Sequence, residues 1–106
     1  MTLLEPPYVL ALDIGTSSAR AELFDRLGRR VPDVEASHAH TPETTPDGGV
    51  EMDPDRLVEA VGEVLSAALE KAGPRAGEIA GVGVCTFWHS ILGVDAAERP
   101  TTPLLV

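Results

Sequence analysis

The hydrophobic and polar positions in the first part of the chain follow the two-residue period of β-strands. Residues 8–14, YVLALDI, are almost continuously apolar, which is typical of a strand buried on both faces. Residues 19–25 alternate between apolar and polar side chains, as expected for the hairpin partner of that strand. A third strand is predicted at residues 30–39, where Pro32 cannot donate to a strand ladder. The pattern therefore predicts three successive strands, with the third at a sheet edge.

A polar segment and then a helical pattern follow these strands. Residues 40–53, HTPETTPDGGVEMD, are rich in proline, glycine and short polar side chains, so we predict a loop without regular structure, ordered in part by Glu51. Asp53 has the position of a helix N-cap, and Pro54 that of the first helical residue. The helix is predicted to end at Gly73 and to pack on the sheet through one apolar face. The residues of that face are Leu57, Val61, Val64, Leu65, Ala68 and Leu69.

The last part of the chain predicts further strands. Residues 79–87 form another apolar run, interrupted by Gly81 and Gly83. Residues 90–95 are predicted to be a strand that leads into a hairpin, and a final strand is predicted to begin near Leu104. The order of strand, strand, strand, helix and strand predicts an α/β fold. In it, a three-strand meander, a crossover helix and a parallel strand make a mixed sheet.

Composition restricts the partners of the chain. Its 106 residues suit one domain with one core. Seventeen acidic and eight basic residues give a net charge of −9, which repels phosphate backbones and anionic lipids, so we expect no nucleic acid or membrane partner. A small anionic ligand remains compatible with this charge, because local amides and an arginine can bind it. Cys85 is the sole cysteine, and no leader or long apolar segment is present, which favours the cytoplasm.

Residues 13–20, DIGTSSAR, bring together the groups that phosphoryl transfer requires: donors for phosphate oxygens, a carboxylate for Mg²⁺ and a cation. Asp13 ends the predicted central strand, and Arg20 is near enough to reach over the turn with its planar guanidinium. Gly15 can take the positive φ of a tight turn and allow a phosphate to approach closely. The hydroxyl-bearing residues of the turn are Thr16, Ser17 and Ser18.

A second candidate site is the segment TFWHS, residues 86–90. Trp88 offers a flat apolar face with one N–H, and His89 offers a donor or an acceptor, which together suit a polyhydroxylated ligand. Each motif also has a purely structural interpretation. The turn can be a simple hairpin of favoured turn residues, and the segment can hold a core tryptophan beside a histidine with its hydrogen bonds satisfied. His38 and His40 are expected to be solvated.

Three blocks in the chain resemble one known family in the same order and at similar spacing. They are LALDIGTSSARAELFD, GGVEMDPDRLVEAV and IAGVGVCTFWHSILGVDAAERPTTPLL, and they span nearly the whole chain. Together they resemble the amino-terminal part of the FGGY carbohydrate kinases, most of all the gluconate kinase-like and xylulose kinase-like members. The resemblance implies a ribonuclease H-like, actin-like ATPase fold in which two such domains close on ATP and a sugar. Residues 1–106 would then be a truncated first domain.

The resemblance also implies roles for individual residues. Asp13 would lie near Mg²⁺, and Arg20 would approach the transferred γ-phosphate. Trp88 and His89 would contact the sugar hydroxyls, and residues 86–87 would shape the pocket. The loop residues that would line the phosphates are Gly15, Thr16, Ser17 and, less directly, Ser18.

The same resemblance places the catalytic base, a carboxylate, beyond residue 106. We therefore expect an amino-terminal fragment that does not phosphorylate a sugar by itself and that self-associates through an unpaired strand edge. The TFWHS and GVDA segments favour gluconate over xylulose as the substrate of the parent kinase. Two alternatives stay open: a non-catalytic module that binds a phosphate, a nucleotide or a protein, and a different ATPase of the actin-like group.

Overall fold

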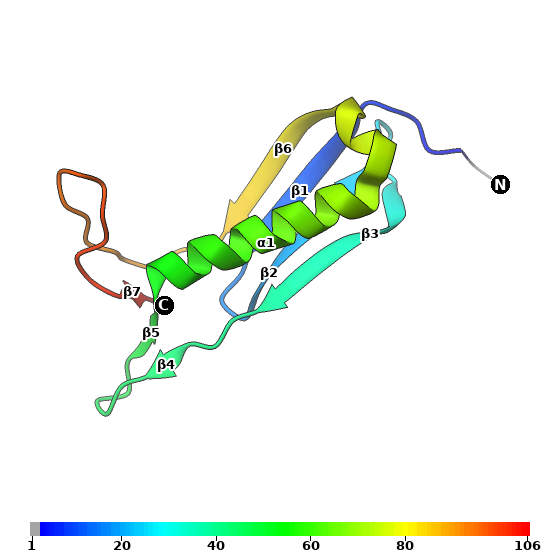
Figure 1. Cartoon of the computed structure of the whole chain (residues 1–106). Coiled ribbons are helices and arrows are strands. Elements are labelled where there is room, and N and C mark those ends of the chain that lie inside the picture. Colours follow the sequence, from blue (N-terminus) through cyan, green and yellow to red (C-terminus); the bar gives the residue numbers. More distant parts are fainter. Residues whose placement is uncertain (1–2) are drawn as a thin grey trace.

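The structure is a computed structural model that describes residues 3–106. Its main sheet has four strands in the order β3-β2-β1-β6 (Figure 1). They are β1 (Tyr8–Ile14), β2 (Ser18–Phe24), β3 (Arg30–Ala39) and β6 (Ile79–Thr86). The first three pair antiparallel, and β6 pairs parallel to β1, which confirms the predicted α/β fold with its mixed sheet. Pro32 lies in β3 at the sheet edge, as predicted.

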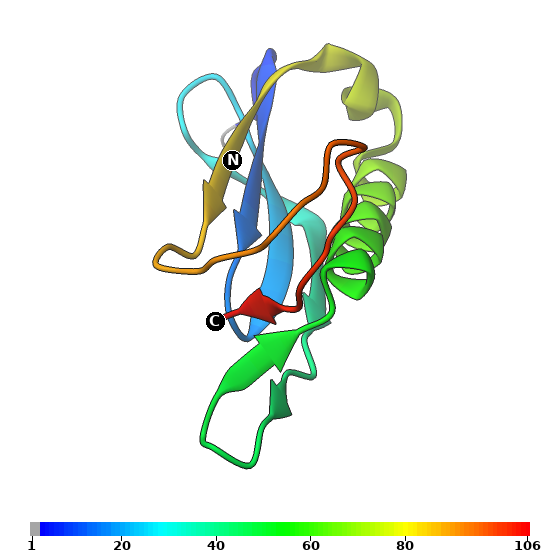
Figure 2. The ribbon, with the colours of Figure 1, turned by 90° about the vertical axis from the view of Figure 1, so that its left-hand side faces the viewer.

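The helix α1 (Pro54–Ala72) crosses between β3 and β6 along one face of this sheet (Figure 2). Its start is fixed by Asp53, whose Oδ1 accepts from the amide of Asp55 at 2.9 Å, so the predicted N-cap is confirmed. Gly73 ends it with a φ of 60°, and a 3₁₀ helix, η1 (Gly73–Glu78), leads into β6. This connection makes β6 parallel to β1.

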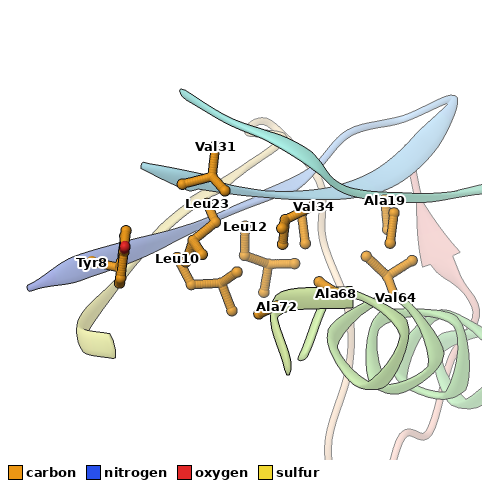
Figure 3. Packing of buried hydrophobic residues seen from close by; sticks show 12 residues of the cluster. Tyr8, Leu10, Leu12, Ala19, Leu23, Val31, Val34, Val64, Ala68 and Ala72 are labelled. Carbon is orange, nitrogen blue, oxygen red and sulfur yellow. The ribbon is translucent and has the colours of Figure 1, made fainter. Parts of the chain in front are cut away.

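The core lies between α1 and the first three strands (Figure 3). Alternate residues of each strand point into it, including Leu10, Leu12 and Leu23. The predicted apolar face of the helix is only partly correct. The helix buries the small residues Ala60, Val64, Ala68 and Ala72, whereas Leu69 is 42% exposed. These four residues recur every fourth position, so their ridge lets the helix approach the sheet closely.

A second, three-stranded sheet lies next to the start of α1 (Figure 1). It consists of β4 (Glu43–Thr44), β5 (Val50–Met52) and β7 (Leu104–Leu105), so the prediction of an irregular loop over residues 40–53 is wrong in part. A β-turn closes the β4–β5 hairpin: the amide of Gly48 donates to the Thr45 carbonyl at 3.0 Å, and the amide of Thr45 donates across the hairpin to the Gly49 carbonyl at 2.8 Å. Glu51 pairs with Leu105, which confirms the predicted final strand.

The strand predicted at residues 90–95 does not form. Only two isolated bridges occur there, Ile91 with Leu105 and Val94 with Pro100. No helix within residues 3–106 has the length and apolarity that crossing a lipid bilayer requires.

Asp25 organises the turn between β2 and β3 and is 3% exposed. Its Oδ1 accepts from the amides of Leu27 and Arg29, each at 2.9 Å, and its Oδ2 accepts from the amide of Glu5 at 3.1 Å. Burial alone would raise the pKa of this carboxyl. The hydrogen bonds from the Arg29 side chain and backbone, with those from the Glu5 and Leu27 amides, outweigh burial and hold the pKa well below its ordinary value.

Candidate functional site

The two predicted site segments lie at the same edge of the main sheet. Because β1 and β6 are parallel neighbours, their carboxyl ends are side by side, with Ile14 paired to Thr86. The amide of Phe87 donates to the Ile14 carbonyl at 3.1 Å and continues this pairing beyond β6. The β1–β2 loop and the segment that carries Trp88 therefore leave the sheet from adjacent strands.

The β1–β2 loop is a tight reversal with free donors at its tip. The amide of Gly15 donates to the Ser18 carbonyl at 2.9 Å and closes the turn. Thr16 and Ser17 are exposed, and within the described residues no backbone carbonyl accepts from their amides. Consecutive free amides beside hydroxyl groups can bind the oxygens of an anion.

Gly15 is required at this turn for a different reason from the one predicted. Its φ is not positive; the glycines with positive φ in the described chain are Gly28, Gly48 and Gly73. A Cβ at Gly15 would instead lie 3.1 Å from the Ser18 carbonyl oxygen, closer than most side-chain contacts allow. Gly15 therefore permits the close approach of two backbone segments.

Asp13 and Arg20 form the charged part of the site. They are paired across the β1–β2 ladder, and Arg20 Nη2 contacts Asp13 Oδ2 in an ion pair. They alternate with the buried residues Leu12, Ala19 and Ala21, so both lie on the sheet face opposite the helix. Arg20 Nη2 thus lies beside Asp13 and also 4.0 Å from the place of a Cβ at Gly15, so the guanidinium reaches the start of the turn. Their side chains are 45% and 50% exposed, so each is accessible to a ligand.

Trp88 is exposed at the end of the β6 segment. Its 80% exposure excludes the interpretation of a core tryptophan. Its ring lies 4.1 Å from that of His89, measured between centroids, with the planes tilted by 38°. His89 has a φ of 63°, which is uncommon for a residue other than glycine and turns the chain sharply after Trp88. The pair presents an aromatic face and imidazole nitrogens to solvent.

His40 is a site residue that the sequence analysis missed. His38 is about half exposed, 3.7 Å from Glu63, as expected for a solvated residue. The expectation for His40 is wrong: its amide donates to the Ser17 carbonyl at 2.9 Å, and its Nε2 is buried without a partner in the described chain. Burial lowers the pKa of His40, the backbone of Gly15 raises it, and the charge on His38 lowers it further, for a net lowering. The place of His40 against Ser17 follows from the pairing of β3 with β2, which the residues near His40 do not indicate.

The polar groups of the site could bind Mg²⁺ together with a phosphate group. The described side chains alone could not hold the metal. Over residues 3–106, no three His, Cys, Asp or Glu side chains lie close enough to hold a metal ion by themselves. Mg²⁺ in nucleotide sites is usually held by one or two carboxylates, with phosphate oxygens and water completing its shell. Asp13 beside a loop with free amides matches that chemistry.

Comparison with known proteins gives a consistent family. Residues 8–106 match the model of the FGGY family of carbohydrate kinases, N-terminal domain. Ribulokinase from Geobacillus thermodenitrificans is 30% identical over 102 residues, which cover 88% of this chain and 18% of that protein. Glycerol kinase from Roseiflexus sp. is 42% identical over 77 residues, or 73% of this chain and 15% of that protein.

Two solved structures extend this likeness to the fold. Gluconate kinase from Lactobacillus acidophilus superposes with a TM-score of 0.81 at 26% identity, over 92% of this chain and 19% of that one. A xylulose kinase from Brucella ovis superposes with a TM-score of 0.86 at 25% identity, over 93% of this chain and 20% of that one. The chain thus spans about a fifth of the length of the proteins that it matches.

Proposed function

The chain belongs to the FGGY family of carbohydrate kinases, and on that premise we propose that it forms the phosphate-binding part and one side of the sugar site of an ATP-dependent carbohydrate kinase. The observation that supports this most directly is the common edge of β1 and β6. There the loop with the free amides of Thr16 and Ser17 follows β1, and the segment with Trp88 and His89 follows the adjacent strand β6. Phosphoryl transfer requires that phosphate and acceptor sites be adjacent.

We assign the phosphate side to the β1–β2 loop. The amides and hydroxyls of Thr16 and Ser17 would bind phosphate oxygens, with Ser18 in a minor role. Gly15 would allow the phosphate to approach the backbone. The guanidinium of Arg20 would stabilise the charge that spreads over the transferred γ-phosphoryl group. Its planar fork suits phosphate oxygens as well as it suits the carboxylate of Asp13.

Asp13 is the residue that we assign to Mg²⁺, through water or directly. When bound with ATP, the metal supplies positive charge against the phosphate oxygens. In the structure Asp13 has Arg20 as its partner. Binding of Mg·ATP would give each of the two side chains a new partner of opposite charge, phosphate for Arg20 and the cation for Asp13. An exposed ion pair contributes about 0–1 kcal/mol, so this exchange costs little.

We assign the sugar side to the segment after β6. Trp88 would pack its ring against the carbon skeleton of the substrate, and His89 would exchange hydrogen bonds with hydroxyl groups. We place a sugar acid of the gluconate type first and a ketose of the xylulose type second, because TFWHS and GVDA favour gluconate. Solved kinases for both substrate types superpose on this chain.

The test is a phosphorylation assay on the longest protein that the reading frame encodes. Gluconate, xylulose, ribulose and glycerol would be compared with ATP and Mg²⁺, and we expect the highest kcat/KM for gluconate. Trp88→Ala should raise the KM for the sugar and leave the KM for ATP unchanged. Leu3→Ala is the matched control, because Leu3 is an exposed apolar residue before β1, at the opposite end of that strand from the site. Failure to phosphorylate any polyol, ketose or sugar acid would overturn the kinase proposal.

Two further statements belong to this proposal. Residues 1–106 by themselves would not phosphorylate a sugar, because the family resemblance assigns the base to a later carboxylate. We also propose a cytoplasmic location, where the exposed thiol of Cys85 would stay reduced.

A further inference from the structure

Asp13 and Arg20 balance each other's charge without help from a third charged group. They face each other across β1 and β2, and the next strand on either side places an uncharged residue beside them: Cys85 of β6 beside Asp13, and Ser37 of β3 beside Arg20. Among residues 3–106, neither side chain takes part in a second ion pair. A ligand that takes one partner therefore leaves the other unpaired.

This contact weakens Asp13 as a ligand for a free cation. A guanidinium against the carboxylate cancels much of the negative potential that attracts Mg²⁺, and it repels the cation directly. Other side chains do not compensate, because residues 3–106 contain no group of three metal-binding side chains. In nucleotide sites, phosphate oxygens complete the shell of a Mg²⁺ held by one or two carboxylates. Mg²⁺ alone would have to displace Arg20, which gains no new partner in exchange.

The same contact weakens Arg20 as a ligand for a phosphate without metal. A phosphate that took the guanidinium would leave the carboxylate of Asp13 unpaired beside a polyanion, and like charges at short range repel each other. The distance to the loop is no obstacle, because Arg20 Nη2 lies 4.0 Å from the place of a Cβ at Gly15. Only a ligand that carries both charges lets both side chains change partner together.

We propose that the ion pair of Asp13 and Arg20 blocks the site against free Mg²⁺ and against metal-free ATP, so that the chain selects the Mg·ATP complex. The identity of the selected ligand rests on the proposed function, whereas the block of each side chain by the other does not. Cation and phosphate both favour the separated pair, so each raises the affinity for the other. Because the pair is exposed, the block changes an affinity by about two- to fivefold.

A titration with MgCl₂ in the absence of nucleotide tests the block of Asp13. Nuclear magnetic resonance on the ¹⁵N-labelled chain follows the amides of residues 13–17 at low ionic strength. Arg20→Ala should bind Mg²⁺ about two- to fivefold more tightly than wild type. Arg30→Ala removes the same charge from another exposed ion pair and should leave the response of residues 13–17 as in wild type. Asp13→Asn should abolish the response.

The gain in Arg20→Ala should shrink at about 0.5 M NaCl, because salt screens exposed charges. The proposal is overturned by equal Mg²⁺ affinities of wild type and Arg20→Ala, by an equal gain in Arg30→Ala, or by a gain that salt does not change. It is also overturned if Arg20→Ala shows no response to Mg²⁺. If Arg20→Ala does not fold, Arg20→Gln decides, since glutamine removes the charge and keeps a polar side chain.

A titration with ATP in EDTA tests the block of Arg20 through its partner. Asp13→Asn should bind metal-free ATP about two- to fivefold more tightly than wild type, and Mg·ATP about tenfold more weakly. Asp33→Asn makes the same change at an exposed residue of β3 and should match wild type for both ligands. If Asp13→Asn changed both affinities in the same direction, the proposed selection would be wrong.

The two titrations also separate this proposal from the proposed function. A wild-type loop that responds to ATP neither with nor without Mg²⁺ counts against the nucleotide assignment. In that case the Mg²⁺ titration of Arg20→Ala still decides whether Arg20 blocks Asp13. If the wild-type loop binds Mg·ATP while Arg20→Ala and Asp13→Asn show no gain for the single ligands, the nucleotide assignment stands and the block is overturned.

Discussion

Asp13 and Arg20 lie opposite each other on neighbouring antiparallel strands and neutralise each other at the edge where the candidate site lies. Both are about half exposed, so their attraction is screened by water. A pair of this kind is easily exchanged for stronger partners, because a phosphate and a divalent cation carry more charge than either side chain. Mutation of Arg20 is therefore the most direct test of whether this pair binds Mg·ATP.

Replacement of Arg20 by alanine should weaken binding of Mg·ATP by about 10- to 100-fold, the loss expected for hydrogen bonds to a charged group. Arg30→Ala is the control, since Arg30 is similarly exposed at 51% but pairs with Glu35 at the far strand. Titrations followed by nuclear magnetic resonance can measure affinities in the millimolar range. Equal affinities of the two variants would contradict the assignment of Arg20.

Gly15→Ala should destabilise the chain by about 1 kcal/mol, since the new methyl group crowds the Ser18 carbonyl and opens the turn. Urea denaturation followed by circular dichroism measures this. Gly81→Ala is the control, because nothing lies within 4 Å of a Cβ built there. That variant should be as stable as wild type or slightly more stable. If Gly15→Ala were as stable as wild type, the turn would be able to widen without cost, which would contradict this prediction.

Asp25→Asn should lower the melting temperature more than Asp33→Asn, an exposed residue whose φ of 64° suits asparagine. An amide in place of the buried carboxylate turns one acceptor oxygen into a donor that faces other donors.

The pH dependence of stability follows from the same carboxyl. Because the pKa of Asp25 is lower in the folded chain than its ordinary value of 3.8, its contribution is complete above that value. The contribution is lost as the pH falls through the folded-state pKa. Thermal melts of wild type and Asp25→Asn should therefore converge as the pH falls below about 4. If the difference in melting temperature between the two proteins stayed constant as the pH falls, the charge of Asp25 would not contribute to stability.

Residues 1–106 should self-associate through β6. This edge strand contains no charged residue, and Val82 and Val84 are 56% and 59% exposed. Free strand edges without charge or proline favour pairing with another copy. Val84→Lys should shift the sedimentation profile toward the monomer, whereas Val58→Lys on α1, which is 71% exposed, should not. A wild-type monomer at high concentration would contradict this expectation.

Local signals in the sequence predicted the elements that have local causes. The strand at Tyr8–Ile14 and the capping of α1 by Asp53 and Pro54 depend on neighbouring residues, and both are confirmed. The prediction that this strand is buried on both faces is wrong, because Val9 on the face away from the helix is 43% exposed. The hairpin of β4 and β5 was missed because two short strands carry too little periodicity, and their third partner, Leu104–Leu105, is far along the chain. The buried ridge of α1 was misjudged because alanine ranks low in hydrophobicity yet fits closely against a sheet.

By itself the sequence determined the α/β order of elements and the two motifs with candidate chemistry, because periodicity, caps and turn residues act over a few positions. Only the tertiary structure decided which residues meet. Because β6 pairs parallel to β1, the segment with Trp88 leaves the sheet beside the β1–β2 loop. The antiparallel register of β1 and β2 places Asp13 opposite Arg20. The register of β3 placed the amide of His40 on the Ser17 carbonyl and buried its Nε2. Such contacts depend on strand pairing between distant segments, for which no short stretch of sequence carries a signal.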